Sequence, residues 1–426
     1  MSSAERAIEP LGHGVDADVR LPGSKSLTNR ALVCAALAEG RSVLEGALQA
    51  DDTEAMISCL SALGVSVAPD WPRATVMVEG CAGRFPPGDV TLDARMSGTT
   101  ARFLAPLLAL GQGRRRLTGH PQLLARPMGP IVNALETLGA DVVAVDRDGH
   151  LPIEVRATDA LRGGAVQVPG RESSQFLSGL LLAGPTMTEG VVVEVTDLVS
   201  RPYVVLTTTT MAAFGVDVDV SGSTYRVPPS LYRATSYTVE PDASAASYFF
   251  AAAAICGGRV RVHGLGSTSA QGDLGFVDVL ARMGAEVERG ADWTEVRGTG
   301  RLVGIDVDLA DLSDTAPTLA IVAACASTPT RVTGIGFIRG KESDRIGAAV
   351  AELRRCGVDA EEEPDGFIVR PDLPATRGAP IKTYDDHRMA MSFAVLGLRV
   401  PGISILDPRT VAKTFPDFFE ALEGLR

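Results

Sequence analysis

The chain has 426 residues, of which 45% are hydrophobic and 22% are charged. This composition is that of a globular protein, and the length predicts two domains rather than one. The net charge of −12 argues against nucleic acid and anionic membranes as partners. A small anionic ligand would therefore need positive charge that the chain gathers locally.

The N-terminal stretch MSSAERAIEP lacks the apolar core of a secretory signal, and the longest apolar run, around YFFAAAAICGG, is shorter than a membrane span. We therefore expect a soluble, cytoplasmic protein. The six cysteines form no CxxC pair, which favours reduced, buried thiols. The five histidines show no HExxH or Cys/His spacing, so the sequence gives no sign of a metal site.

The first predicted elements are a strand over residues 14–19 and, after the Pro22–Gly23 break, a helix from Ser26 to Gly40. Lys25 stands at the start of this helix, where the helix dipole disfavours a cation. An anion held jointly by the lysine and by free helix N–H groups explains that placement. The chain has only four lysines, at positions 25, 341, 382 and 413. They are candidates for sites that need a compact ammonium group, except that Lys382 fits no motif and is interpreted as a surface residue.

Farther along the chain, amphipathic helical patterns end in a glycine that is followed by an alternating strand pattern. Glycine favours the left-handed conformation that closes a helix, so each pattern predicts a helix, a cap and a strand. These glycines recur at near-equal spacing, at positions 64, 139, 215, 284 and 357. The periodicity indicates an internal repeat. A sixth helix, FPDFFEALEGLR, ends the chain without its strand, and the strand pattern at 14–19 is predicted to complete this last unit.

Each repeat also contains a second helix that is apolar on most sides and is therefore expected to be buried. These helices begin near residues 26, 98, 173, 243, 314 and 386. The pattern predicts six strand-helix-strand-helix-strand units, three in each domain. We predict a first domain over residues 23–238 and a second over 1–22 plus 239–426, with the active site in the cleft between them.

The starts of the buried helices carry the polar motifs SKS, SGTT, SSQ, DAS, DTAP and DHR. Parallel helices that aim their N-termini at one place would together attract an anion. Ordinary N-caps explain the Ser and Asp residues equally well. Capping does not explain the basic residues beside them, at positions 25, 30, 102 and 388.

Three residues of the second half have a structural interpretation beside any functional one. Glu342 could form a helix-end ion pair with Arg345, three residues away. Asp314 could be only the N-cap of the apolar helix that follows it, and His387 could be a structural cap. These alternatives stay open on the residues alone.

Eight motifs together resemble those of the 5-enolpyruvylshikimate-3-phosphate (EPSP) synthase family of enolpyruvyl transferases, from about residue 14 to the C-terminus. In order, they are GSKSLTNRALVCAALA, SGTTARF, ARPMGPIVNAL, SSQFLSGLLLA, LVSRPYV, GKESDR, YDDHRMAM and AKTFPDFFE. The resemblance implies an α/β fold: a two-domain inside-out α/β barrel with three βαβαββ repeats per domain. It also implies transfer of the enolpyruvyl group of phosphoenolpyruvate to the 5-hydroxyl of shikimate 3-phosphate, with release of phosphate, on the shikimate pathway to aromatic amino acids.

The resemblance further implies a role for individual residues, with Lys25 contacting both substrates. Shikimate 3-phosphate would be held by Lys25, Ser26, Arg30, Ser173, Ser174, Gln175, Ser200, Tyr203, Asp314 and Lys341. Phosphoenolpyruvate would be held by Lys25, Gly98, Arg126, Gln175, Arg345, Arg388 and Lys413. The supporting residues would be Thr99, Arg102, Asp386 and His387.

In the chemistry that the resemblance implies, Asp314 is the base for the 5-hydroxyl and Glu342 donates a proton to the methylene carbon of phosphoenolpyruvate. The reaction would pass through a tetrahedral intermediate by addition and elimination. Lys25 is the third catalytic residue, because it would neutralise the leaving phosphate together with the arginines. No metal or organic cofactor is implied. We expect a monomer that is sensitive to glyphosate and binds small anionic substrates, with neither nucleic acid nor membrane as a partner.

The sequence departs from the family pattern at three positions. Met96 and Phe337 stand where members of the family carry asparagine, and Phe103 stands where many carry proline. We expect these departures to affect how the substrates are bound rather than which reaction is catalysed.

Three other functions remain open. Phe337 leaves room for a paralogous enolpyruvyl transferase that acts on another carbocycle. The related transferase for UDP-N-acetylglucosamine uses a mobile-loop cysteine, which is absent beside ARPMGP, and it lacks the SSQ motif found here. A non-catalytic anion-binding module would be expected to lose Asp314 or Glu342, and both are present.

Overall fold

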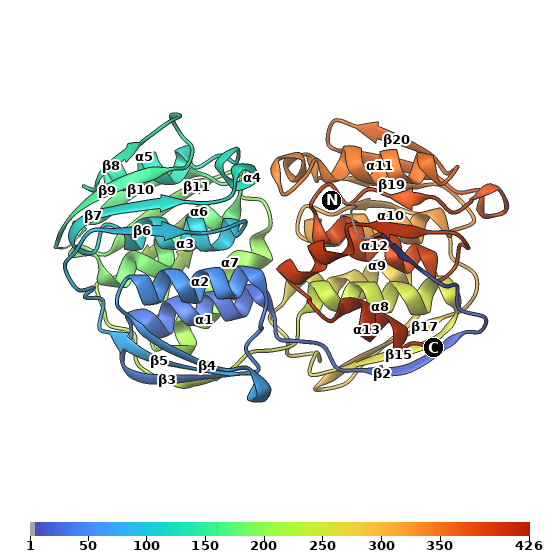
Figure 1. Ribbon diagram of the computed structural model, residues 1–426, viewed down its shortest axis with the longest axis horizontal. Coiled ribbons are helices and arrows are strands. Elements are labelled where there is room, and N and C mark those ends of the chain that lie inside the picture. The colour runs from blue at the N-terminus through green and yellow to red at the C-terminus, as the bar shows by residue number, and fades with distance from the viewer. Residues whose placement is uncertain (1–4, 160) are drawn as a thin grey trace. The chain divides into compact units, whose positions relative to one another are not determined.

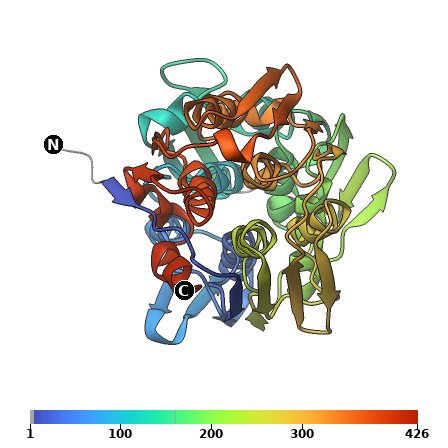
Figure 2. The ribbon, with the colours of Figure 1, turned by 90° about the vertical axis from the view of Figure 1, so that its right-hand side faces the viewer.

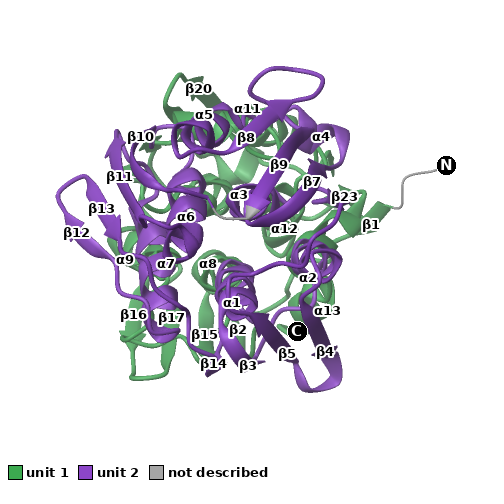
Figure 3. Ribbon diagram, turned by 90° about the vertical axis from the view of Figure 1, so that its left-hand side faces the viewer, with its two compact units in different colours: residues 1–22, 241–426 green, residues 23–240 purple. Residues whose placement is uncertain are grey.

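The computed structural model describes residues 5–159 and 161–426, and it divides the chain into two compact units. Unit 1 consists of Met1–Pro22 and Pro241–Arg426, and unit 2 is Gly23–Glu240 (Figure 3). Residues 1–4 of the predicted second domain lie outside the described residues. Unit 2 ends at Glu240, whereas the predicted first domain ends at residue 238. Val239 and Glu240 belong to unit 2 because Val239 donates a backbone hydrogen bond to Glu45 and Glu240 accepts one from Ser24.

The strands of the described residues form six sheets, three in each unit (Figure 1). The first sheet of unit 2 has the strand order β14 (Ser236–Thr238), β3 (Glu39–Glu45), β5 (Thr75–Cys81) and β4 (Ser66–Asp70). The second has the order β6 (Val90–Asp93), β7 (Gly111–Thr118), β9 (Ile153–Asp159) and β8 (Asp141–Ala144). The third has the order β10 (Gly164–Pro169), β11 (Val191–Thr196), β13 (Thr224–Val227) and β12 (Asp219–Ser221). Each of these sheets joins one parallel pair to an antiparallel hairpin.

Unit 1 repeats this arrangement twice and then shortens it. Its first sheet has the strand order β2 (Val15–Val19), β15 (Gly258–His263), β17 (Trp293–Gly298) and β16 (Glu286–Arg289). The second has the order β18 (Asp306–Asp308), β19 (Thr330–Thr333), β21 (Gly366–Arg370) and β20 (Asp359–Glu363). The third, shorter sheet has the order β22 (Pro380–Ile381), β23 (Ser404–Leu406) and β1 (Glu5–Ala7). The recurrence of one sheet pattern is what the glycine periodicity predicted.

The prediction that residues 14–19 complete the last repeat is wrong. Strand β2 runs parallel to β15, so it belongs to the fourth repeat. The last sheet instead takes β1, which is antiparallel to β23, and Figure 2 shows this blue N-terminal strand beside the red C-terminal elements. Both N-terminal strands therefore pack in unit 1. Residues 8–14 connect them, so that β1 belongs to the last sheet and β2 to the β15 sheet.

Six helices with buried apolar faces occupy the interior of the two units. They are α1 (Lys25–Leu37), α3 (Gly98–Leu107) and α6 (Ser174–Ala183) in unit 2, and α8 (Ala243–Cys256), α10 (Ala316–Ala324) and α12 (His387–Gly397) in unit 1. Within each unit these three helices contact one another. Figure 3 shows the strands of unit 2 around its central helices, and each unit has its own apolar core.

Each repeat also has a helix with one buried and one exposed face. These helices are α2 (Asp51–Ala62), α5 (Gly129–Thr137), α7 (Arg201–Ala213), α9 (Phe276–Arg282), α11 (Arg345–Arg355) and α13 (Phe418–Glu423), and a short helix α4 (Pro121–Leu124) precedes α5. The predicted glycines at 64, 139, 215, 284 and 357 all have positive φ, as a left-handed helix cap requires. Among the described residues, no helix is both long enough and apolar enough to span a membrane.

A close approach of two backbones sets the packing of α3 on α6. A Cβ atom added at Gly179 of α6 would collide with the carbonyl oxygen of Arg102 in α3. Only a glycine lets the two helices meet at this distance, and Arg102 stands on the helix that this contact positions.

We expect Gly179→Ala to lower the free energy of unfolding by about 1–3 kcal/mol, because backbone atoms cannot yield as a flexible side chain can. Gly129→Ala is the matched control, since its Cβ would lie 3.6 Å from the Cα of Gly149, an ordinary contact. Denaturant unfolding of both variants measures the difference. Equal stabilities would show that α3 and α6 are not held at this spacing.

Candidate active site

Lys25 is the first residue of α1, and Ser24 caps that helix by accepting a hydrogen bond from the backbone N–H of Leu27. The ammonium Nζ lies 3.4 Å from a carboxylate oxygen of Asp52, whose side chain is buried in the first turn of α2. The placement of a cation at a helix N-terminus is thus explained in part by a neighbouring carboxylate. Nothing in the sequence pattern singles out Asp52, because acidic residues in the first turn of a helix are ordinary compensation of the helix dipole.

Arg30 is buried on the same helix, and in the described structure its hydrogen bonds go to uncharged oxygens. Its guanidinium donates to the hydroxyl of Thr207 at 2.8 Å and to the carbonyl oxygens of Ser26 at 3.0 Å and Tyr203 at 2.8 Å. It also stacks over the ring of Phe103 at 5.1 Å. Burial lowers the pKa of Arg30 to about 10. A cation desolvated to this degree favours an anionic ligand beside it.

Two further arginines, Arg102 and Arg126, lie at the N-terminus of α3. A Cβ atom built on Gly98 would lie 2.6 Å from Nη1 of Arg102 and 2.8 Å from Nη1 of Arg126. The guanidinium groups of these two buried arginines therefore lie against the backbone of Gly98. Free N–H groups of a first helical turn and two guanidiniums are the components of an anion site.

Gln175 of α6 joins this group to the next helix. Its side-chain oxygen accepts from Arg102 at 3.0 Å, and its amide nitrogen donates to the hydroxyl of Thr99 at 3.3 Å. Arg102 also donates to the carbonyl of Pro127 and lies over the ring of Phe176. These contacts orient the guanidinium of Arg102.

Four further predicted residues of unit 2 lie at the starts of α6 and α7. Ser173 caps α6 by accepting from the backbone N–H of Gln175 at 3.2 Å, and both Ser173 and Ser174 are buried. Ser200 has a left-handed φ of 53° before α7, and its carbonyl accepts from the N–H of Tyr203. Because Tyr203 also accepts from Arg30, the start of α7 lies beside the start of α1. We refer to these residues of α1, α3, α6 and α7 as the unit 2 cluster.

Arg345 is the centre of a second group, the unit 1 cluster, and its side chain is only 1% exposed. It donates to Asp386 from Nε at 2.8 Å, to Asp314 from Nη1 at 3.1 Å and to Glu342 from Nη2 at 2.7 Å. Burial alone would lower the pKa of Arg345, but the three carboxylates raise it overall. The ion pair between Glu342 and Arg345 that the spacing suggested is therefore present.

Arg388 completes the unit 1 cluster from the first turn of α12. Its Nη2 donates to Asp314 at 2.6 Å, so Asp314 bridges two buried arginines. Asp386 is the N-cap of α12 and accepts from the backbone N–H of Arg388 at 2.9 Å. The N-cap of α10 is Thr315 rather than Asp314, so the interpretation of Asp314 as only a helix cap is wrong. Asp386, in contrast, both caps α12 and binds Arg345.

The remaining predicted residues of unit 1 are His387, Lys341 and Lys413. His387 is 1% exposed, and its Nδ1 lies 3.6 Å from Asp386. The ammonium of Lys341 lies 5.8 Å from the ring centre of Phe337, a cation–π distance, so Phe337 supports the lysine by its ring face. Lys413 is buried at the end of a 3₁₀ helix over Pro408–Lys413. Tyr248, within 3.5 Å of Arg388, was not anticipated because it lies in the middle of an apolar helix.

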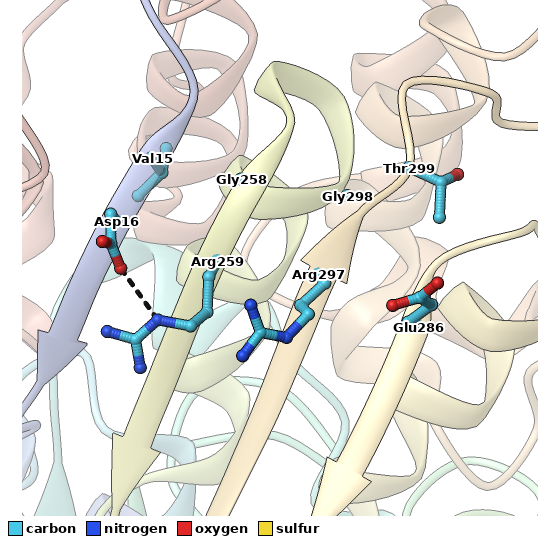
Figure 4. A pocket seen from close by; sticks show the side chains of 8 residues that line it. All are labelled: Val15, Asp16, Gly258, Arg259, Glu286, Arg297, Gly298 and Thr299. Atoms are coloured by element: carbon cyan, nitrogen blue, oxygen red, sulfur yellow. Dashed lines mark hydrogen bonds and ion pairs between the residues drawn. The ribbon is translucent and has the colours of Figure 1, made fainter.

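A pocket of a different character lies on the β16-β17-β15-β2 sheet (Figure 4). Arg259 and Arg297 line this pocket from neighbouring strands, and Arg259 pairs with Asp16 at 2.8 Å. Arg259 also pairs with Asp18, and both arginines pair with the buried Glu295. The carboxylates offset the arginines, so this pocket lacks the local excess of positive charge that a multiply charged anion needs.

We expect Asp386→Asn to lower the free energy of unfolding by about 3 kcal/mol, because it leaves Arg345 buried beside one carboxylate fewer. Asp70→Asn is the control, since Asp70 pairs with Arg73 on an exposed segment where an ion pair contributes little. Denaturant unfolding of the two variants gives the comparison. A similar, small effect at both positions would contradict the central place of Asp386 in the cluster.

Residues 11–422 match the family model of EPSP synthase (3-phosphoshikimate 1-carboxyvinyltransferase). Proteins named 3-phosphoshikimate 1-carboxyvinyltransferase are 47% identical in Nostoc punctiforme, over 97% of both chains, and 44% identical in Methanoculleus marisnigri, over 96% of this chain and 97% of the relative.

Among solved structures, EPSP synthase from Acinetobacter baumannii superposes with a TM-score of 0.84 at 29% identity, over 98% of this chain and 97% of that one. The enolpyruvyl transferase NikO from Streptomyces tendae shares the fold with a TM-score of 0.79 at 20% identity, over 99% and 98% of the two chains. The fold class and the family that the motifs predicted are both confirmed. The chain belongs to the EPSP synthase family.

Proposed function

We propose that the protein transfers the enolpyruvyl group of phosphoenolpyruvate to the 5-hydroxyl of shikimate 3-phosphate and releases phosphate. The observation that carries this proposal is the unit 1 cluster, in which two carboxylates, Asp314 and Glu342, share the buried guanidinium of Arg345. A reaction between two anions that also moves two protons needs such a combination of cations and acids. Family membership gives the substrates their identity.

Shikimate 3-phosphate is the proposed ligand of the residues around the starts of α1, α6 and α7. They are Lys25, Ser26, Arg30, Ser173, Ser174, Gln175, Ser200 and Tyr203, with Asp314 and Lys341 from unit 1. Arg30 supports this assignment most strongly, because it is a buried cation whose hydrogen bonds in the described structure end on neutral oxygens. A carboxylate or phosphate of the substrate would supply the opposite charge.

Phosphoenolpyruvate is the proposed ligand of Lys25, Gly98, Arg126, Gln175, Arg345, Arg388 and Lys413. Thr99, Arg102, Asp386 and His387 orient these groups. Gly98 allows the substrate to approach the backbone where the guanidiniums of Arg102 and Arg126 meet.

The ion pairs of unit 1 suggest how binding prepares the acids for chemistry. Arg345 and Arg388 both donate to Asp314, and Arg345 also donates to Glu342. A substrate carboxylate that takes over these donors releases Asp314 and Glu342 from their ion pairs. The two acids then become available for proton transfer only when phosphoenolpyruvate is in place.

In the proposed reaction Asp314 removes the proton of the 5-hydroxyl, whose oxygen attacks C2 of phosphoenolpyruvate. Glu342 protonates the methylene carbon, which gives a tetrahedral intermediate with a methyl group. The methyl group then returns a proton to Glu342, the C2–O bond to phosphate breaks while the departing phosphate takes the proton held by Asp314, and the enol ether forms. Lys25 stabilises the charge of the leaving phosphate. We also propose that the enzyme acts in the cytoplasm as a monomer without nucleic acid or membrane partners, since both substrates are small and soluble.

Release of inorganic phosphate tests the proposal. Phosphoenolpyruvate with shikimate 3-phosphate should give rapid release, whereas shikimate without its phosphate should give little. Activity with UDP-N-acetylglucosamine in place of shikimate 3-phosphate would assign the protein to the related transferase reaction. No release with any of these acceptors would refute enolpyruvyl transfer.

We expect Glu342→Gln to keep substrate binding and to lose at least about 100-fold in kcat, because an amide hydrogen-bonds but cannot donate this proton. Exchange of solvent deuterium into the methylene group of phosphoenolpyruvate should fall in parallel. Glu361→Gln, an exposed change in β20, is the control. Exchange that persists while turnover is lost would mean that another residue donates the proton.

We expect Gly98→Ala to weaken inhibition by glyphosate more than it raises the KM for phosphoenolpyruvate. The added methyl group pushes against Arg102 and Arg126, and glyphosate is the longer of the two ligands. Stability should hardly change, because the crowded atoms are the ends of flexible side chains. Gly129→Ala is the control, and an equal loss for both ligands would place Gly98 outside the shared subsite.

A further inference from the structure

The segment before α12 makes a tight and strained turn. Tyr384 and Asp385 have φ values of 55° and 54°, and the N–H of Asp386 donates to the carbonyl of Thr383 at 2.9 Å. Two positive φ values at the centre of such a turn are the signs of a type I′ turn, which favours Asn-Gly. A tyrosine is strained in this conformation, and an aspartate is strained to a smaller degree. The surrounding structure must therefore hold the turn in place.

Glu352, near the end of α11, supplies contacts that hold this turn. Its side chain is completely buried. One carboxylate oxygen accepts from the hydroxyl of Tyr384 at 2.8 Å, and the other accepts from the backbone N–H of Lys382 at 3.2 Å. Arg355 balances the charge with its Nε at 3.0 Å. Glu352 thus binds the backbone just before the turn and the side chain of Tyr384 within it.

The same helix holds the other end of the segment. Arg345, seven residues before Glu352 and so on the same face of α11, donates to Asp386 through Nε at 2.8 Å and Nη2 at 3.3 Å. The hydroxyl of Ser343, just before the helix, also donates to Asp386 at 3.0 Å. Helix α11 therefore fastens the turn at its start and at its end, and α12 begins directly after it.

We propose that Glu352 and Tyr384 are positioning residues, which hold the strained turn so that Asp386 and Arg388 keep Arg345 and Asp314 in the geometry that receives phosphoenolpyruvate. This inference rests on the proposed function. Neither Glu352 nor Tyr384 touches the proposed substrates, so their effect passes through the start of α12. The hydroxyl of Tyr384 is suited to the task as a permanent donor, since partial burial and the hydrogen bond to Glu352 raise its pKa to about 12.

The contact could instead serve stability alone. In that case its loss would lower the amount of folded protein and affect kinetics with both substrates alike. Positioning predicts a selective effect, because the residues of the unit 1 cluster are proposed to hold phosphoenolpyruvate, whereas most proposed contacts of shikimate 3-phosphate lie in unit 2. The two interpretations can therefore be separated by kinetics with each substrate varied in turn.

The test uses Tyr384→Phe in the full-length protein, since this change removes one hydroxyl and keeps the ring and the backbone strain. We expect the KM for phosphoenolpyruvate to rise about three- to tenfold and the KM for shikimate 3-phosphate to stay within twofold. Tyr225→Phe, a partly buried tyrosine in β13 of unit 2, is the matched control and should change neither. Equal effects of Tyr384→Phe on both KM values, or none, would overturn the proposal.

A second change tests the strain itself. Glycine adopts positive φ freely, so adding Asp385→Gly to Tyr384→Phe should bring the KM for phosphoenolpyruvate back towards the wild-type value. A role of the hydroxyl in packing alone would not be rescued in this way. Failure of the rescue would therefore contradict the strained turn as the route of the effect.

Hydrogen–deuterium exchange of the unliganded protein separates failure of this inference from failure of the proposed function. Tyr384→Phe and Glu352→Gln should each speed amide exchange in the peptide over residues 382–388, while Tyr225→Phe should not. Unchanged exchange would show that Glu352 and Tyr384 do not hold the turn, and it would refute this inference even in an active enzyme. Faster exchange in a protein without enolpyruvyl transfer would show that the two residues hold the turn but that the reaction was assigned wrongly, which also ends the positioning role.

Discussion

Burial of guanidinium groups is the constraint on which the rest of the structure depends. An acidic protein that handles anions must bring positive charge out of water, and each buried cation then needs a counter-charge or a full set of acceptors. Unit 1 meets the need with carboxylates, because Arg345 contacts Asp386, Asp314 and Glu342. In unit 2 Arg30 makes its hydrogen bonds to uncharged oxygens, which leaves its charge for the proposed substrate.

The N-terminal turns of the central helices are the positions in the repeated fold where these buried charges lie. In each repeat the central helix is apolar along its length, so its polar residues collect at its start. Those first turns also carry unpaired backbone N–H groups and the positive end of the helix dipole. Close packing keeps the starts near one another: Gly179 lets α6 approach the backbone of α3 at Arg102, whose guanidinium then meets Gln175 at the start of α6. The apolar core thereby sets the geometry of the polar residues.

The carboxylates of unit 1 have two tasks that pull in different directions. As partners of Arg345 and Arg388, Asp314 and Glu342 stabilise buried cations, and as proposed acid and base they must be free to exchange protons. Competition by a substrate carboxylate reconciles the two tasks. Asp386 differs from both, since it is completely buried, caps α12 and is fastened to α11. It is suited to remain in place while the other two acids change partners.

Local patterns in the sequence determined the positive-φ glycines that close the helices, the six buried helices and the motifs at their starts, because each depends on residues a few positions apart. Strand partners were decided by tertiary structure. Residues 15–19 alternate as any edge strand does, and only packing in unit 1 assigns them to β15 and leaves residues 5–7 for β23. The ion pair of Lys25 with Asp52 and the hydrogen bond of Tyr384 to Glu352 likewise join segments that no local signal connects. Such contacts follow from how helices and sheets pack, which a single sequence does not encode in any short window.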